Sequence, residues 1–530
     1  MSYQSIQFLI FAAIVLVVYY IAGAISRRLQ KYVLLIANVY FYAQAGMDYI
    51  PFMLVTLLTT YLAGRWMGRI YQRTDEKLAQ CETTADKKQL RALAKKRARR
   101  VVVAAFIIAA ALLVVCKCSQ SIIAAVNELL ESRGAEQFTL FSVIMPLGIS
   151  YYTFMAIGYV LDVYWKRCEA EKNIVTYGAF LIYFPHIVQG PIDRFGALKP
   201  QLADGAKLSY KNLAFGGQLI LWGLFKKMVI ADRINQVVTR VFAGYATYSG
   251  SVVLVAAVFA ALELYCNFSG CIDIVRGYSQ MLGIELAENF DHPFFSKSAA
   301  EFWRRWHVSL GAWFRDYVYM PLSVSPRLIK FTKKCRGVIG ERAGKAMASV
   351  IPTAVVWLLT GFWHGTGWNY IVWGIYWGLM IILSNVFAPE IKKLSGLLRI
   401  DTESGGWQVF RMIRTFFLFV AGRIITMPGD LRASREMFRH IFTQFKLASL
   451  FDGTLYCVGL DRPNFLLAIA ALAVLWAVSL MQRRGPLRER IAESPLVFRW
   501  IVYYALIFAI IIFGMYGPGF VASEFVYGNF

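Results

Sequence analysis

The chain has 530 residues, of which 58% are hydrophobic and 15% are aromatic, and its formal net charge is +24. A mean hydropathy of +0.51 excludes an ordinary soluble protein of this size. The basic residues cluster between apolar runs, which favours anionic lipid headgroups over nucleic acid as their partner. The eight cysteines form no CxxC pair, so neither a disulfide framework nor a zinc site is predicted.

Apolar runs of the length that crosses a hydrocarbon core, about 17 to 25 residues, recur along the chain. The first run is followed rather than preceded by basic residues, which indicates a membrane helix with its N-terminus outside and not a cleavable signal. Helices are predicted near residues 6–25, 31–46, 49–68, 101–118, 140–165, 174–190, 212–231, 250–268, 347–364, 369–388, 407–428, 464–481 and 497–514.

These runs predict an all-α polytopic membrane protein with roughly eleven to thirteen crossings. Two strongly basic stretches, residues 69–100 and 323–346, are interpreted as cytoplasmic loops by the positive-inside rule. A further arginine cluster, residues 483–490, also lies inside, so both termini are expected outside. We find no internal repeat, and a single domain over residues 1–530 is expected, with its motif core at about residues 140–390.

One glycine-rich stretch, residues 360–369, reads TGFWHGTGWN and separates the apolar runs 347–359 and 370–387. It places His364 at a break between two segments able to enter a membrane. An ionisable group at that depth is costly unless it is paired or faces a cavity, so it indicates a functional site. The glycines allow the backbone to turn and a ligand to approach closely. The alternative is a tight interhelical turn with a packed histidine.

A second histidine, His307, lies in a tryptophan- and arginine-rich stretch, residues 301–317. Helical spacing places Arg304, Arg305 and Arg315 away from a broad aromatic face. That face comprises Phe302, Trp303, Trp306, Leu310, Trp313 and Tyr317. The period predicts one amphipathic helix lying at the membrane interface. The alternative is a surface helix whose arginines only bind phosphate headgroups.

The two histidines suit acyl transfer, because a neutral imidazole with an ordinary pKa of about 6.5 can accept a hydroxyl proton at physiological pH. We assign the role of catalytic base to His364. His307 would orient the substrate or stabilise developing oxyanion charge. Trp303 and Trp306 would pack around the site.

Six sequence motifs resemble the membrane-bound O-acyltransferase (MBOAT) family, in particular its alginate O-acetyltransferase branch, which is related to the D-alanyl transfer protein of teichoic acid modification. Two are long, EFWRRWHVSLGAWFRDYVYMPL and GFWHGTGWNYIVWGIYWG, and begin at residues 301 and 361. Four shorter ones occur in the same order as in that branch: MPLGISYYTFMAIGYVLDVY (145–164), FPHIVQGPIDRF (184–195), LYCNFSGCIDI (264–274) and ENFDHPF (288–294).

The resemblance implies a ring of tilted, re-entrant and interfacial helices around a central funnel. His364 matches the catalytic histidine of the family, and His307 matches its second position, a histidine or an asparagine. The donor would be acetyl-CoA or a phosphopantetheine-linked acyl group entering from the cytoplasm, with no tightly bound cofactor and no metal. Substrate-binding roles are expected for Trp303, Trp306, Trp363, Asn369, Asp316, Asn267 and Tyr527. Asn267 stands where an aspartate is common.

The C-terminal segment, residues 524–530, resembles the aromatic ending of this branch, except that Gly528 replaces an aromatic residue. We predict that Tyr527 reaches back from the outer face toward the acceptor funnel. The alternative is a terminal aromatic anchor at the outer interface.

The sequence therefore predicts a multi-pass O-acyltransferase, expected to be an O-acetyltransferase, in the cytoplasmic membrane of a bacterium. The acceptor would be a hydroxyl of a cell-surface polysaccharide such as alginate, or an outward-facing relay protein. An acyl carrier and membrane lipid are possible partners, and nucleic acid is not expected. Three alternatives remain open: D-alanyl transfer from a carrier protein to a teichoic-acid-like polymer, a transporter or flippase, and an inactive export scaffold.

Overall fold

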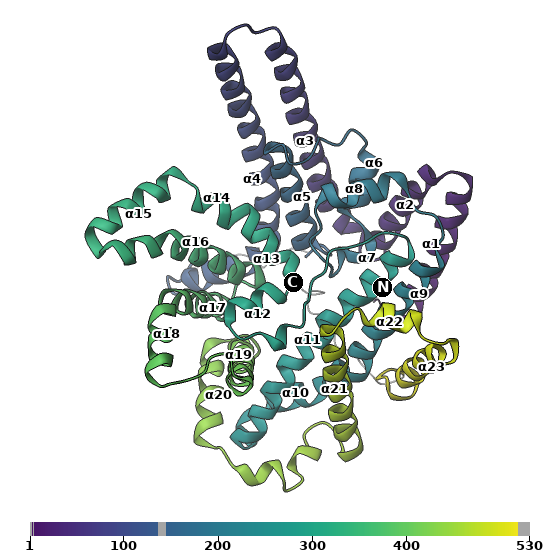
Figure 1. The fold of residues 1–530 in the computed structure, drawn as a ribbon, viewed down its shortest axis with the longest axis vertical. Coiled ribbons are helices and arrows are strands. Elements are labelled where there is room, and N and C mark those ends of the chain that lie inside the picture. The colour runs from purple at the N-terminus through teal and green to yellow at the C-terminus, as the bar shows by residue number, and fades with distance from the viewer. Residues whose placement is uncertain (1–2, 4, 136–144, 518–530) are drawn as a thin grey trace. The chain divides into compact units, whose positions relative to one another are not determined.

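A computed structural model describes residues 3, 5–135 and 145–517, and within these ranges the chain is predominantly helical (Figure 1). The one β-type contact there is an isolated antiparallel bridge between Phe290 and Trp306. The all-α prediction is therefore confirmed. Two compact units are present. Among the described residues, the first comprises the chain up to Gly217 together with Val275–Ala287, and the second comprises Gln218–Ile274 and the chain from Glu288 to Gly517.

Eight helices lie wholly in the first unit. They are α1 (Ile6–Ile25), α2 (Gln30–Ala43), α3 (Ile50–Ala79), α4 (Thr84–Glu131), α5 (Ile149–Tyr164), α6 (Ile174–Leu181), α7 (Phe184–Ile187) and α8 (Phe195–Asp204). Helix α5 is buried over almost its whole length. Buried Asn38 ties α2 to two other segments, because its amide donates to the Ala179 carbonyl and its oxygen accepts from the Phe184 amide.

The basic segment 69–100 is not a loop, and that prediction is wrong. Helix α3 continues to Ala79, and α4 begins at Thr84 after an N-cap in which the Thr83 hydroxyl accepts from the Asp86 amide. Figure 1 shows α3 and α4 side by side, joined by a short turn. Lysine, arginine and alanine all favour helix, so a high charge did not interrupt the helices.

Helix α9 (Tyr210–Leu224) leads into the second unit through a π-helical turn, Phe225–Ala231. The helices that follow are α10 (Asp232–Ala243), α11 (Gly250–Met281), α12 (Ala299–Arg305), α13 (Val308–Phe314), α14 (Met320–Ser323), α15 (Pro326–Ile339), α16 (Glu341–His364), α17 (Trp368–Val386), α18 (Ala388–Leu397), α19 (Gly405–Thr426), α20 (Leu431–Thr443), α21 (Arg462–Arg483), α22 (Leu487–Glu493) and α23 (Leu496–Phe513). The predicted basic loop 323–346 is therefore also largely helical, as α15 and the start of α16.

Nine helices in the described ranges are long and apolar enough to cross a membrane. Four other predicted runs do not meet that criterion. Three of them form shorter helices: α2 in the run 31–46, α5 in the run 140–165 and α6 in the run 174–190. The fourth run, 407–428, forms α19, which contains Arg411, Arg414 and Arg423. The sequence count of eleven to thirteen crossings had included these runs.

The hairpin of α16 and α17 depends on close backbone contact at glycine. A Cβ atom on Gly361 would lie 2.6 Å from the Tyr370 carbonyl oxygen, and one on Gly374 would lie 2.5 Å from the Trp357 carbonyl oxygen. Neither position leaves room for a side chain. The two helices can therefore approach closely on either side of the turn that follows His364.

Candidate active site

The backbone turns sharply at His307. We expected one continuous amphipathic helix over residues 301–317, and this prediction is wrong, because α12 ends at Arg305 and α13 begins at Val308. His307 has a φ of 47°, in the left-handed region that non-glycine residues seldom occupy. A strained backbone of this kind persists only where its surroundings hold it, and it is common at functional sites.

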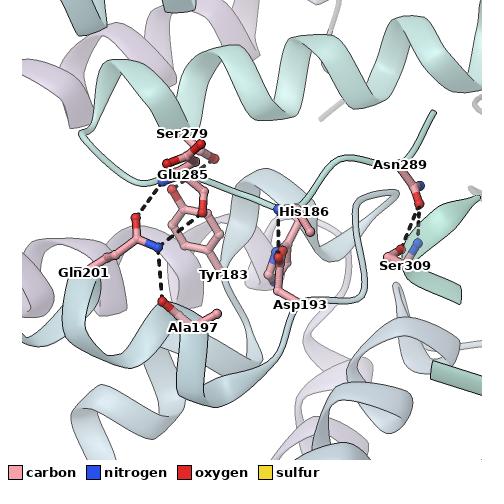
Figure 2. Close-up of polar contacts among 10 residues, drawn as sticks. Tyr183, His186, Asp193, Ala197, Gln201, Ser279, Glu285, Asn289 and Ser309 are labelled. Carbon is pink, nitrogen blue, oxygen red and sulfur yellow. Dashed lines mark hydrogen bonds and ion pairs between the residues drawn. The ribbon is translucent and has the colours of Figure 1, made fainter. Parts of the chain in front are cut away.

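Asn289 holds this turn through both its main chain and its side chain. Its carbonyl oxygen accepts from the Val308 amide at 3.0 Å. Its side-chain Oδ1 accepts from the amide and the hydroxyl of Ser309 at 3.1 and 2.8 Å, as Figure 2 shows. Asn289 therefore holds residues 308 and 309, which directly follow the strained His307. These hydrogen bonds explain why the amphipathic pattern did not produce a continuous helix.

The same Asn289 oxygen lies 3.1 Å from Nδ1 of His307. Because the Ser309 amide can only donate, the atom it contacts must be the amide oxygen of Asn289. Nδ1 of His307 therefore carries the proton, and Nε2 carries the lone pair. This tautomer makes Nε2 a hydrogen-bond acceptor.

His307 is 2% exposed and lies outside the nine candidate membrane spans. Burial disfavours the charged imidazolium and lowers the pKa of His307 to about 3. The imidazole ring is therefore neutral at physiological pH, and a neutral ring is required for Nε2 to accept a hydrogen bond.

His364 is the last residue of α16, at the predicted glycine-rich break, and it is half-buried. Its imidazole lies edge-on to the ring of Trp363 and to the ring of Trp373, with ring centroids 4.8 Å apart in both cases. Two indole rings from α16 and α17 therefore fix its position.

The two histidines share one aromatic neighbour. The Trp363 ring centroid lies 6.1 Å from that of His307 and 4.8 Å from that of His364. Phe268 of α11 packs edge-on against His307 from another element, with centroids 4.9 Å apart. We call five rings of this region the aromatic cage. Phe268, Trp363 and Trp373 contact a histidine, and Trp303 and Trp306 pack against Trp373 and Phe268 in turn.

Trp303 and Trp306 pack against other aromatic rings of the second unit, and their predicted place at the site stays a prediction. Trp303 contacts Trp373 at 5.6 Å and Trp357 at 4.8 Å between ring centroids. Trp306 contacts Phe268 at 6.3 Å and Phe290 at 5.0 Å. Helices α11, α12, α16 and α17 are joined by these contacts, so the cage is built from distant parts of the second unit.

Three further predicted substrate-binding residues have partners of their own. Asn369 is 3% exposed near the start of α17, and its amide donates to the Thr426 carbonyl at 3.4 Å. Asn267 is buried in α11 and donates to Glu263 at 2.9 Å. Asp316 accepts from Arg315 at 2.9 Å in a π-helical turn, Arg315–Tyr319. These contacts position side chains and helices, and the substrate roles stay predictions. Tyr527 lies outside the described residues.

Some residues of this region were not singled out in the sequence. Asn289 lies in the ENFDHPF motif, but its role as the anchor of His307 depends on contacts across eighteen residues of sequence. Trp373 and Phe268 are ordinary members of apolar runs. Only the high tryptophan density around residues 303 and 363 hinted at the aromatic cage.

Two other groups of buried polar residues were also missed. In the second unit, Lys227 bonds Asp232 and Lys226 bonds Asp273, both at 2.8 Å, at the π-helical turn after α9. In the first unit, Nδ1 of buried His186 lies 3.5 Å from Asp193, whose other oxygen accepts from the Ala287 amide (Figure 2). Buried charges require such pairing. In the described ranges, no three histidine, cysteine or acidic side chains gather as a metal site.

In the part of the chain that the structure describes, nine helices of spanning length and apolar composition define a polytopic helical membrane protein. Residues 170–333, which include His307 but not His364, match the family model described as MBOAT, membrane-bound O-acyltransferase family. A protein of Pseudomonas syringae pv. tomato named "Probable alginate O-acetylase AlgI" is 31% identical, over 91% of this chain and 83% of its own. The chain belongs to the membrane-bound O-acyltransferase family and is an O-acyltransferase.

Two more distant relatives cover less of the chain. The "Peptidoglycan O-acetyltransferase" of Helicobacter pylori is 27% identical over 52% of this chain and 55% of its own. The "Teichoic acid D-alanyltransferase" of Bacillus subtilis is 29% identical over 52% of this chain and 66% of its own. Both predicted branches of the family are thus represented among the relatives.

Proposed function

We propose that this enzyme transfers an acetyl group from a cytoplasmic thioester donor to a hydroxyl of a cell-surface polysaccharide, or of an outward-facing protein that relays it. The observation that carries the proposal is the aromatic cage, in which Trp363 contacts both histidines. The printed names of the relatives support acetyl as the group and a cell-envelope polymer as the acceptor. The enzyme would act in the cytoplasmic membrane of a bacterium, with both termini outside.

In this proposal His364 is the general base. It takes the proton of the acceptor hydroxyl while the oxygen attacks the thioester carbonyl. The new C–O bond forms as the C–S bond breaks, and the proton passes from His364 to the leaving thiolate. No redox partner or metal is required, and the acceptor gains an ester.

The tautomer of His307 favours one of its two predicted roles. Nε2 carries a lone pair, so it can accept a hydrogen bond from a second hydroxyl of the substrate, beside the one whose proton His364 takes, but it cannot donate one to an oxyanion. Asn289 fixes that orientation through Nδ1. We therefore assign His307 to orienting the acceptor, and leave oxyanion stabilisation to other donors.

The D-alanyl alternative has the support of the relatives bearing that name, which match about half of the chain. It requires a carrier protein as donor. An assay that supplies the purified enzyme with acetyl-CoA or with a D-alanyl carrier separates the two. Ester formed only from the carrier would replace acetyl transfer by D-alanyl transfer.

A basic donor entrance is expected at one of the two positive segments, residues 69–100 or 323–346, where most charges are exposed. Replacing Lys333 and Lys334 of α15 by glutamate should raise the KM for an anionic donor more than it changes kcat. Raising the salt concentration should have the same effect, because exposed charges are screened over about 10 Å at 0.1 M.

The matched control replaces the exposed Lys392 and Lys393 of α18 by glutamate, the same change in charge outside both segments. The equivalent charge reversal in the other segment is at Lys95 and Lys96 of α4. If the KM for the donor changes neither with salt concentration nor with charge reversal in either segment, an electrostatic entrance is contradicted.

The tail prediction compares Tyr527→Phe with removal of residues 525–530. If Tyr527 orients the acceptor through its phenol, both variants should lose acyl transfer. If Phe retains the rate that truncation removes, packing is the role of the ring. Wild-type rates in both variants would reduce the tail to an anchor and contradict the prediction.

A further inference from the structure

We propose that the second unit binds an anionic phospholipid. One acyl chain would occupy an apolar cavity between α11, the Pro293–Phe295 turn and α21, and the headgroup phosphate would lie on Arg483. This site is separate from the acyl-transfer chemistry proposed above.

The cavity has a volume of about 240 Å³. Its lining is largely apolar and includes Leu262, Tyr265, Phe294, Leu472, Trp476 and Ser479. The members on α21 recur three and four residues apart, so one face of that helix forms a wall along the helix axis. Trp476 is 61% exposed, so this wall continues onto the outer surface of a helix long enough to span a membrane.

A cationic group follows this apolar wall. The same face of α21 continues to Gln482 and Arg483, in the last turn of the helix. The Arg483 side chain is exposed, and its guanidinium carbon lies 4.6 Å from the centroid of the Phe295 ring. His292, which also lines the cavity, places Nε2 3.1 Å from Gln482 Oε1. The cationic Arg483 thus lies beyond the end of the apolar cavity, just as the charged headgroup lies beyond the end of the acyl chain in a phospholipid.

The charge at this end favours an anionic headgroup. Residues 483–490 contain four arginines against one acidic residue, Glu489, and Asp291 is the acidic side chain that contacts His292. Basic groups next to a membrane helix attract anionic lipids, which are enriched in the cytoplasmic leaflet. That leaflet is also where the positive-inside rule places this cluster.

The lining argues against the acyl donor as the occupant. A pantetheine arm carries amides that need hydrogen-bond partners when buried. The one hydroxyl on the cavity wall contributed by α21 is that of Ser479, and it donates to the Leu475 carbonyl at 2.8 Å. A hydrocarbon chain makes no such demand.

Occupancy of the cavity would reach the aromatic cage through shared walls. Tyr265 lines the cavity, and its ring centroid lies 6.1 Å from that of Trp306. Phe294 also lines the cavity, and its ring centroid lies 6.4 Å from that of Phe302. A bound chain therefore supports the packing behind Trp306, and anionic lipid should raise the rate of acyl transfer.

The test is native mass spectrometry of the full-length protein equilibrated with phosphatidylglycerol or phosphatidylcholine. Wild type should retain phosphatidylglycerol in preference. Arg483→Gln should weaken that retention about fivefold, the scale of one basic residue near an anionic surface. Arg439→Gln, the same change at an exposed arginine of α20 outside this cluster, should leave it unaltered.

The cavity itself is tested by Ser479→Phe, which fills it, against Val474→Phe, on an exposed part of α21 outside the lining. Only Ser479→Phe should lose the bound lipid. Equal retention of both lipids by wild type, or unchanged retention by Arg483→Gln, would overturn the proposal. So would displacement of the lipid by acetyl-CoA, since the cavity would then belong to the donor. The Arg483 comparison stands even if Ser479→Phe does not fold.

Discussion

Replacing His364 by alanine is expected to lower the rate of acyl transfer by about 10²- to 10⁴-fold, the usual contribution of a general base. The imidazole is half-buried at the end of α16, between the rings of Trp363 and Trp373. Its removal leaves the glycine contacts of the α16–α17 hairpin intact. The measurement is the initial rate of ester formation by protein reconstituted in vesicles, normalised to folded protein.

The matched control for this variant is His440→Gln. His440 lies on α20, and its Nε2 is 2.7 Å from the Tyr248 carbonyl oxygen, so its contact is structural. The control should retain a rate close to that of wild type. A well-folded His364→Ala enzyme with a near-normal rate would remove His364 from the mechanism.

The second large effect is expected at His307. His307→Ala should lower the rate of acyl transfer by about 10²-fold or more, because it removes Nε2, the atom that accepts a hydrogen bond from the substrate. Alanine also places an unsuitable residue at a φ of 47°. His307→Asn is the informative variant, since asparagine tolerates the left-handed region and keeps a hydrogen-bond acceptor. It should fold and should be more active than the alanine variant; equal loss in both would contradict an orienting role.

His307 also predicts a pH dependence of stability. The folded-state pKa of about 3 lies below the ordinary 6.5, so the unfolded chain binds a proton in this interval while the folded chain does not. Stability contributed by the neutral ring is complete above pH 6.5 and decreases as the pH falls toward 3. His307→Asn should therefore lose less stability than wild type between pH 7 and 5, as measured by thermal unfolding in detergent. An identical decrease in both proteins would contradict the lowered pKa.

The membrane helices could be predicted because hydrocarbon thickness imposes a length on apolar runs. Residues 6–25 were predicted and observed with the same bounds. The charged segments could not be identified as helices by the same argument. In the 48-residue helix α4, the signal came from helix propensity and the Thr83 cap rather than from hydropathy.

The candidate site was predictable only in part. Glycines around His364 signalled a break, because a membrane helix has few reasons to contain them so closely. The sequence around His307 instead has an uninterrupted amphipathic period, which predicts a continuous helix and not the break that the structure shows. The break arises from Asn289, whose hydrogen bonds to residues 307–309 appear only once the tertiary fold has formed. Local patterns do not record such contacts.

The most direct test of the central claim, that both histidines serve one reaction, is a double-mutant cycle. The rate of acetyl transfer from acetyl-CoA to the polysaccharide is measured for His364→Ala, for His307→Asn and for the double variant. Residues that act as a unit are strongly non-additive. We predict that the double variant loses no more than about the larger single loss. Two losses that multiply in the double variant would show independent sites and contradict this account.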